Sequence, residues 1–102
     1  MKGTKVSIIT PCLNSKKTIR QTIESVLNQT YENIEYIIVD GGSTDGTLAV
    51  IREYAPLFQG RLKYVSEKDR GIYDAMNKGI RLSTGRLIGI INSDDWYEPD
   101  AV

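Results

Sequence analysis

The stretch IEYIIVDGGSTDG (residues 34–46) decides the fold. Its first six residues are almost continuously apolar, which is typical of a strand in a parallel sheet whose two faces are both covered. The following residues 40–46 are turn formers and end in helix-capping side chains. The stretch therefore predicts a strand that leads through a tight turn into a helix, the repeating unit of an α/β protein.

Similar units lie on both sides of this stretch. The pattern predicts strands at 6–10, 34–39, 62–65 and 87–91, and helices at 16–28, at 48–55 and from about residue 71. The order βαβαβαβ predicts a parallel sheet with right-handed crossovers and helices on both faces. We expect the first strand to lie inside the sheet, in the order third, second, first, fourth.

Composition narrows the protein class. The chain has 102 residues, 13 Lys+Arg, 13 Asp+Glu and no His, so its net charge is zero and it is one domain at most. Zero charge argues against a general nucleic-acid binder. Cys12 is the single cysteine, which excludes a disulfide framework and argues against structural zinc. The sequence shows neither a membrane-spanning run nor a signal peptide, so we expect a reducing cytoplasm.

Two acidic loops are candidates for ligand binding. Asn92-Ser93-Asp94-Asp95 follows the fourth strand, and Asp40-Gly41-Gly42-Ser43 follows the second. Ligands of such sheets bind outside the carboxyl ends of the strands, where the acidic pair could hold Mg²⁺ or Mn²⁺ and the glycine loop a base or ribose. Both stretches are also typical of ordinary turns and helix caps, and from spacing alone the acidic pair favours that interpretation.

Other signals are weaker. Arg70, beside Lys68 and Asp69, could donate to a phosphate or a base, or belong to a solvated charge run. Neither a G-x-G-x-x-G turn after the first strand nor a Walker A motif occurs, which argues against dinucleotide and P-loop sites. Cys12 has no histidine to activate it, so we expect it to pack.

Four motifs in order resemble the signatures of family 2 glycosyltransferases. They occupy residues 6–14, 24–31, 39–47 and 92–95. Residues 69–80 further resemble the bacterial branch that builds O-antigen, capsule and exopolysaccharide. The resemblance covers the chain from Val6 onward and implies a GT-A (Rossmann-like) fold, a nucleotide-sugar donor, a divalent cation (Mn²⁺ or Mg²⁺) and inversion at the anomeric carbon.

The resemblance also implies site residues, matched by position. The donor side comprises Thr10, Pro11, Leu13, Asn14, Asp40, Gly41, Arg70 and Asp94. Asp40 would lie on the base side, Arg70 at the base or phosphate, and Asp94 near the ribose or sugar. Asp95 would hold the metal on the diphosphate, where the ion neutralises charge on the leaving group.

Two positions depart from the family pattern. The family often has Tyr where Leu13 stands, and a second Asp, which typically holds uracil, where Gly41 stands. UDP remains the first expectation for the donor nucleotide. We expect residues 1–102 to be the N-terminal, donor-binding part of a truncated domain, with the general base beyond Val102, so that this fragment binds donor at most.

The resemblance implies partners and a location as well. We expect the full-length enzyme to use a glycan or lipid-linked acceptor and no nucleic acid, and to act in the cytoplasm, with association at the inner face of the membrane. An uncovered sheet edge predicts self-association. A noncatalytic nucleotide-binding or interaction fragment stays open as an alternative. A receiver-like domain is disfavoured, because it needs acidic residues where Pro11–Leu13 and Ser66-Glu67 stand.

Overall fold

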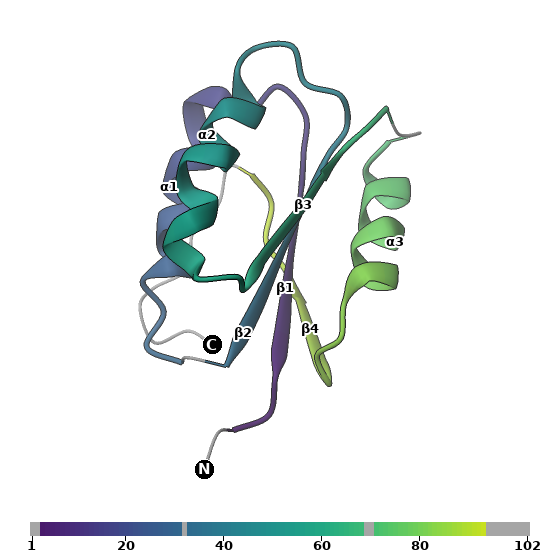
Figure 1. The fold of residues 1–102 in the computed structure, drawn as a ribbon. Helices are drawn as coiled ribbons and strands as arrows, with labels where there is room; N and C mark the ends of the chain where they lie inside the picture. Colours follow the sequence, from purple (N-terminus) through teal and green to yellow (C-terminus); the bar gives the residue numbers. More distant parts are fainter. Residues whose placement is uncertain (1–2, 32, 69–70, 94–102) are drawn as a thin grey trace.

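The computed structural model describes residues 3–31, 33–68 and 71–93 (Figure 1). Its elements are β1 (Val6–Cys12), α1 (Lys16–Leu27), β2 (Ile34–Asp40), α2 (Thr47–Tyr54), the 3₁₀ turn η1 (Ala55–Phe58), β3 (Leu62–Ser66), α3 (Ile72–Leu82) and β4 (Leu87–Ile90). The strands form a sheet in the order β3-β2-β1-β4 with every pair parallel. Helices α1 and α2 lie on one face and α3 on the other (Figure 1). The predicted fold class and strand order are confirmed.

Strand β1 runs through Pro11, where the sequence predicted its end. The Ile91 N–H donates to the Ile9 carbonyl at 3.0 Å, whereas the Gly41 N–H donates to the Cys12 carbonyl at 2.9 Å. Odd-numbered residues of β1 therefore point their backbone groups toward β4 and even-numbered ones toward β2. The missing N–H of Pro11 faces the β4 side, where the paired register ends at Ile9, so the proline removes no ladder hydrogen bond.

The carboxyl ends of the first three strands lie level with one another. Cys12 pairs with Asp40 in the register of β1 and β2, and Asp40 pairs with Ser66 in that of β2 and β3. Strands β2 and β3 each extend one residue further than the apolar runs predicted. The extension places polar side chains at this edge of the sheet, because the ladder continues past the last apolar residue.

Two apolar layers hold the sheet between the helices. The larger one joins the sheet to α1 and α2 and includes the fully buried Tyr36 and Phe58, whose ring centroids lie 5.6 Å apart. The smaller one joins the other face to α3 through Ile9, Ile37, Val39 and Ala75. Burying one such large side chain contributes about 1.5–3 kcal/mol. Both layers are therefore needed to hold the helices on the sheet.

Strand β4 is the exposed side of the described structure. Leu87 is 60% exposed, and Ile88 and Ile90 are exposed as well. The apolar side chains of this edge strand are thus open to solvent within the described residues. Across those same ranges, we find no helix with the length and hydropathy to span a bilayer.

Candidate functional site

The loops after β1 and β2 are hydrogen-bonded to each other. The Asn14 N–H donates to Ser43 Oγ at 2.8 Å, and the Thr44 N–H donates to Asn14 Oδ1 at 2.8 Å. Asn14 has φ of +48°, a left-handed conformation that asparagine tolerates better than most residues. The predicted donor residue Asn14 thus links both loops at the carboxyl edge of the sheet.

Asp45 connects the beginnings of two helices. Its carboxylate accepts hydrogen bonds from the Lys16 N–H at 3.1 Å and from the Thr47 N–H and hydroxyl at 3.0 and 2.5 Å. Thr47 Oγ1 in turn accepts the Ser15 N–H at 2.8 Å. The Thr47 hydroxyl is the main cause of a lowered Asp45 pKa, with further help from the Lys16 and Thr47 amides. The Asp45 carboxylate therefore binds backbone N–H groups at the starts of both α1 and α2.

The loop after β4 joins the same edge. Ser93 Oγ lies 2.8 Å from Ser15 Oγ, at hydrogen-bond distance. Ser15 is the N-cap residue of α1, yet its hydroxyl makes no capping bond and instead contacts Ser93 and the Leu13 carbonyl. Three loops that are far apart in sequence thus meet beside the first turn of α1, as expected for a parallel sheet.

A cavity of about 820 Å³ opens between these loops. The cavity is lined by the loops after β1 and β4, by the starts of α1 and α3, and by Asp45 just before α2. The lining residues are Pro11, Cys12, Leu13, Asn14, Ser15, Lys17, Thr18, Asp45, Gly71, Ala75, Asn92 and Ser93. The structure therefore brings together the predicted Pro11, Leu13 and Asn14, and Leu13 offers a side chain that is 57% exposed. Sequence reasoning missed Lys17 and Thr18, although their position in the first turn after the loop was a usable signal.

The Asp40 side chain is completely buried. Its carboxylate accepts hydrogen bonds from the Ser43 N–H at 2.9 Å, from the Ser43 hydroxyl, from the Ser66 hydroxyl at 2.7 Å and from Cys12 Sγ at 3.4 Å. Burial by itself raises the pKa of this carboxyl, but the bonds from Ser43, Ser66 and Cys12 outweigh it and lower the pKa. Asp40 is thus an ionised, fully hydrogen-bonded side chain with no surface open to a ligand.

Two other predicted donor residues occupy different settings. Thr10 is fully buried, and its hydroxyl lies 2.8 Å from the Tyr36 hydroxyl. Its side chain therefore packs inside the protein, beneath the loop that lines the cavity. Gly41 is half-buried, and its N–H continues the ladder to Cys12. Cys12 is itself buried and packs, as the sequence predicted.

The predicted metal site falls outside the described residues. Asp94 and Asp95 lie there, as does Arg70. In the ranges 3–31, 33–68 and 71–93, no three metal-binding side chains come close enough to hold an ion. The assignment of the metal to Asp95 therefore stays a prediction.

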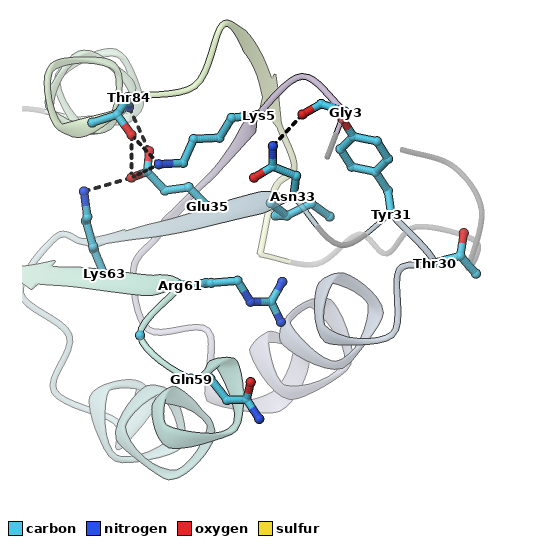
Figure 2. A pocket seen from close by; sticks show the side chains of 12 residues that line it. Gly3, Lys5, Thr30, Tyr31, Asn33, Glu35, Gln59, Arg61, Lys63 and Thr84 are labelled. Carbon is cyan, nitrogen blue, oxygen red and sulfur yellow. Dashed lines mark hydrogen bonds and ion pairs between the residues drawn. The ribbon is translucent and has the colours of Figure 1, made fainter. Parts of the chain in front are cut away.

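A larger hollow of about 1080 Å³ lies at the opposite end of the sheet (Figure 2). The buried Glu35 stands at its wall, where Figure 2 shows Lys5, Lys63 and Thr84 converging on the carboxylate. Lys63 Nζ lies 2.8 Å from Glu35 Oε2, and the Thr84 N–H donates to Oε1 at 2.8 Å. Burial opposes ionisation, but the bonds from Lys63, Thr84 and Ser7 hold the Glu35 pKa at about 2. Lys5 and Lys63 are thus engaged in a structural ion pair, and this hollow contains none of the predicted site residues.

The comparison with known families agrees with this architecture. The sequence model of "Glycosyl transferase family 2" matches residues 7–102. The chain belongs to glycosyl transferase family 2. This family 2 chain is 44% identical over 97 residues to the chondroitin synthase of Escherichia coli, which covers 95% of the chain and 14% of that relative. It is 40% identical over 97 residues to a PGL/p-HBAD biosynthesis glycosyltransferase of Mycobacterium tuberculosis, covering 94% of the chain and 38% of the relative. The chain thus spans well under half the length of these relatives.

Solved structures show the same fold. The mannosyltransferase of Pyrobaculum calidifontis, in complex with GDP-Man and Mn²⁺, superposes with a TM-score of 0.85 at 30% identity, over 92% of this chain and 28% of its own. Residues 1–349 of TarS from S. aureus, in complex with UDP-GlcNAc, superpose with a TM-score of 0.80 at 26% identity, over 90% of this chain and 27% of that one. The family 2 chain therefore has the GT-A fold that its motifs implied.

Proposed function

We propose that this chain is the donor-binding part of an inverting glycosyltransferase that transfers a sugar from a nucleotide-sugar. One observation carries the proposal. Pro11, Leu13 and Asn14, which the family resemblance assigns to the donor, line one cavity at the carboxyl edge of a GT-A sheet. Parallel α/β sheets bind ligands at this edge.

The donor is a nucleoside-diphosphate sugar, with UDP as the first nucleotide to test. Two similar structures, one holding UDP-GlcNAc and the other GDP-Man with Mn²⁺, support the ligand class and the cation. In this proposal Asp95 holds Mn²⁺ or Mg²⁺, Asp94 faces the ribose or sugar, and Arg70 contacts the base or phosphate. The cation supplies Lewis-acid stabilisation of the diphosphate leaving group.

The acceptor is a glycan or a lipid-linked acceptor in bacterial surface polysaccharide synthesis. The names of the relatives support this class, since one is a chondroitin synthase and another a PGL/p-HBAD biosynthesis glycosyltransferase. The cytoplasmic location, association with the inner face of the membrane and self-association through the β4 edge stay predictions.

Titration calorimetry with UDP tests the proposal. We expect binding in Mn²⁺ or Mg²⁺, its loss in chelator and its loss in Asp95→Asn, because a neutral amide forfeits most of its attraction to a hard cation. Glu53→Gln, on the exposed surface of α2, is the matched control and should bind as the unaltered chain does. Equal UDP affinity with and without chelator would contradict the metal role and favour a noncatalytic nucleotide-binding chain.

A further inference from the structure

We propose that the hollow at the amino end of the sheet binds a phosphate ester through the cations of Lys5, Arg61 and Lys63 (Figure 2). The hollow is separate from the cavity at the carboxyl end of the sheet, because the two share no lining residue. Binding here goes beyond the proposed function and does not depend on it.

Positive charge is concentrated in this hollow. The chain as a whole is neutral, with 13 basic and 13 acidic residues. Three cations, Lys5, Arg61 and Lys63, line the hollow with one acid, Glu35, which gives the lining a net charge of +2. The cavity at the carboxyl end is lined by one lysine and one aspartate, whose charges cancel. The hollow at the amino end is therefore the one of the two that attracts anions.

A buried carboxylate fixes the two lysines at the wall of the hollow. Glu35 is only 3% exposed, and its Oε2 lies 2.8 Å from Lys63 Nζ and 3.9 Å from Lys5 Nζ. The Lys5 ammonium also donates to Thr84 Oγ1 at 2.9 Å. A mobile surface lysine loses rotamer freedom when a ligand orders it, whereas these two are already held in place. The site is therefore organised before an anion binds.

Both ammonium groups keep donors for a ligand. An ammonium has three N–H groups. Among the described residues, Lys63 Nζ contacts Glu35, and Lys5 Nζ contacts Glu35 and Thr84. The Lys63 and Lys5 side chains are both about half exposed, so their remaining N–H groups are accessible from the hollow that they line.

Arg61 adds a cation from the turn between η1 and β3. Its Nε donates to the Phe58 carbonyl at 3.2 Å, and its guanidinium carbon lies 5.9 Å from the centroid of the Phe58 ring. These contacts hold the side chain where it enters the hollow, and Figure 2 shows the guanidinium pointing into that space. A guanidinium presents a planar fork of donors that matches the oxygens of a phosphate.

The charge and size of the site favour a phosphate ester as its ligand. A phosphate monoester carries a charge of about −1.5 to −2 near pH 7, which matches the net charge of the lining, whereas a carboxylate carries a single charge. The volume of about 1080 Å³ exceeds what a phosphate group fills and lies near the upper end of roughly 300–1,000 Å³ for small-molecule sites. Neutral polar residues such as Thr30 and Gln59 line the rest of the hollow. We expect the organic part of the ester to lie beside them.

An NMR titration with inorganic phosphate at constant ionic strength tests the site. We expect saturable shifts of the Arg61, Lys63 and Thr84 amides, and their absence would overturn the proposal. Arg61→Gln should weaken phosphate binding about 3- to 10-fold, between the values for an exposed ion pair and for a buried charged hydrogen bond. Arg86→Gln is the matched control, because Arg86 is exposed just before β4 and does not line the hollow. Equal weakening by both changes would indicate non-specific attraction and overturn the site.

Lys63→Gln tests the lysines that Glu35 holds. We expect it to weaken phosphate binding about 3- to 10-fold as well. Because this change removes a partner of a buried carboxylate, the double variant Lys63→Gln/Glu35→Gln decides if the single one does not fold by circular dichroism. The double variant keeps the net charge of the lining but no longer holds Lys5. Unchanged phosphate affinity in the double variant would overturn the proposed site, whereas a loss of about 3- to 10-fold supports it.

Vesicles distinguish the two sources of a phosphate ester. Sedimentation with phosphatidylcholine vesicles that contain phosphatidic acid, lost in Arg61→Gln and without pure phosphatidylcholine binding, assigns the site to a lipid headgroup. Phosphate binding without sedimentation assigns it to a soluble ester.

Competition separates this site from the donor cavity. UDP with Mg²⁺ should leave phosphate binding at the hollow unchanged, because the two sites share no lining residue. Displacement of phosphate by UDP would overturn the proposal for the hollow. Phosphate binding at the hollow by a chain that binds no UDP would overturn the proposed function alone.

Discussion

The Asp45 carboxylate accepts a hydrogen bond from the backbone N–H of Lys16, 29 residues earlier, at 3.1 Å. The contact joins the start of α1 to the start of α2, and with them the loops after β1 and β2. A helix leaves its first N–H groups without intrahelical partners, so a carboxylate placed there satisfies a donor and complements the helix dipole. One side chain thus supports the starts of two helices beside the cavity at the carboxyl edge of the sheet.

Removing this carboxylate should loosen both helix starts. We expect Asp45→Ala to lower the midpoint of thermal unfolding more than Asp45→Asn, which keeps one oxygen acceptor. Because the Asp45 pKa is lowered in the folded chain, its contribution is complete above the unfolded pKa and declines as the pH falls. Thermal melts of both variants at neutral and acidic pH measure this. Equal midpoints of thermal unfolding for Asp45→Ala and the unaltered chain would show that Asp45 does not stabilise the two helix starts.

Glu35 should make the fold sensitive to acid. Its pKa falls from a usual 4.5 to about 2 on folding, so its stabilisation is complete above pH 4.5 and disappears as the pH falls toward 2. The full effect is about 3 kcal/mol in the free energy of unfolding. Glu35→Gln lacks this titration. Denaturant unfolding should therefore show that the difference in unfolding free energy between the unaltered chain and Glu35→Gln decreases by about 2 kcal/mol from pH 7 to pH 3. A difference in unfolding free energy that does not change with pH would contradict this role of Glu35.

Even the smallest side chain at position 79 should destabilise the fold. A Cβ at this position of α3 would lie 2.4 Å from Ile9 Cγ2, so Gly79→Ala requires the Ile9 side chain or the helix to shift. We expect a loss of about 1–3 kcal/mol in unfolding free energy, despite the better helix propensity of alanine. Asn77→Ala, on an exposed position of the same helix, is the control and should be neutral or slightly stabilising. In an Ile9→Ala background the cost of Gly79→Ala should shrink, which a four-variant unfolding cycle would measure.

Arg70 should contribute to nucleotide affinity rather than to folding. One charge-assisted hydrogen bond is worth about 1.5–3 kcal/mol, so Arg70→Ala should weaken UDP binding by about 10- to 100-fold with an unchanged melting midpoint. Arg81→Ala, in the last turn of α3, provides the matched control and should leave the affinity intact. Calorimetry and thermal melts on the same samples separate the two effects. Unaltered UDP affinity in Arg70→Ala would remove Arg70 from the donor site.

The sequence alone determined the order and pairing of the strands. Continuous apolar runs such as residues 34–39 marked buried strands, and helical stripes marked the crossovers. Right-handed crossovers, together with the expectation that the two acidic loops face each other, placed the first strand inside the sheet. The family resemblance assigned Pro11, Leu13 and Asn14 to the donor side, and their loop lies at the carboxyl edge of the sheet because it follows a parallel strand directly. These features depend on residues close together in the chain, where periodicity and spacing carry the information.

Only the tertiary structure decided what the buried polar groups do. Asp40 and Glu35 look alike as acidic residues at the end and near the start of one strand. In the structure, Asp40 binds the Ser66 hydroxyl at the end of β3 and the Ser43 hydroxyl in the loop after β2, whereas Glu35 binds an ion-pair cluster. Their partners lie up to 49 residues away, as Thr84 does from Glu35. The same register showed that Pro11 could stay within β1. Which groups meet depends on strand register and helix packing, and a buried charge is stable only where that packing supplies its hydrogen-bond partners.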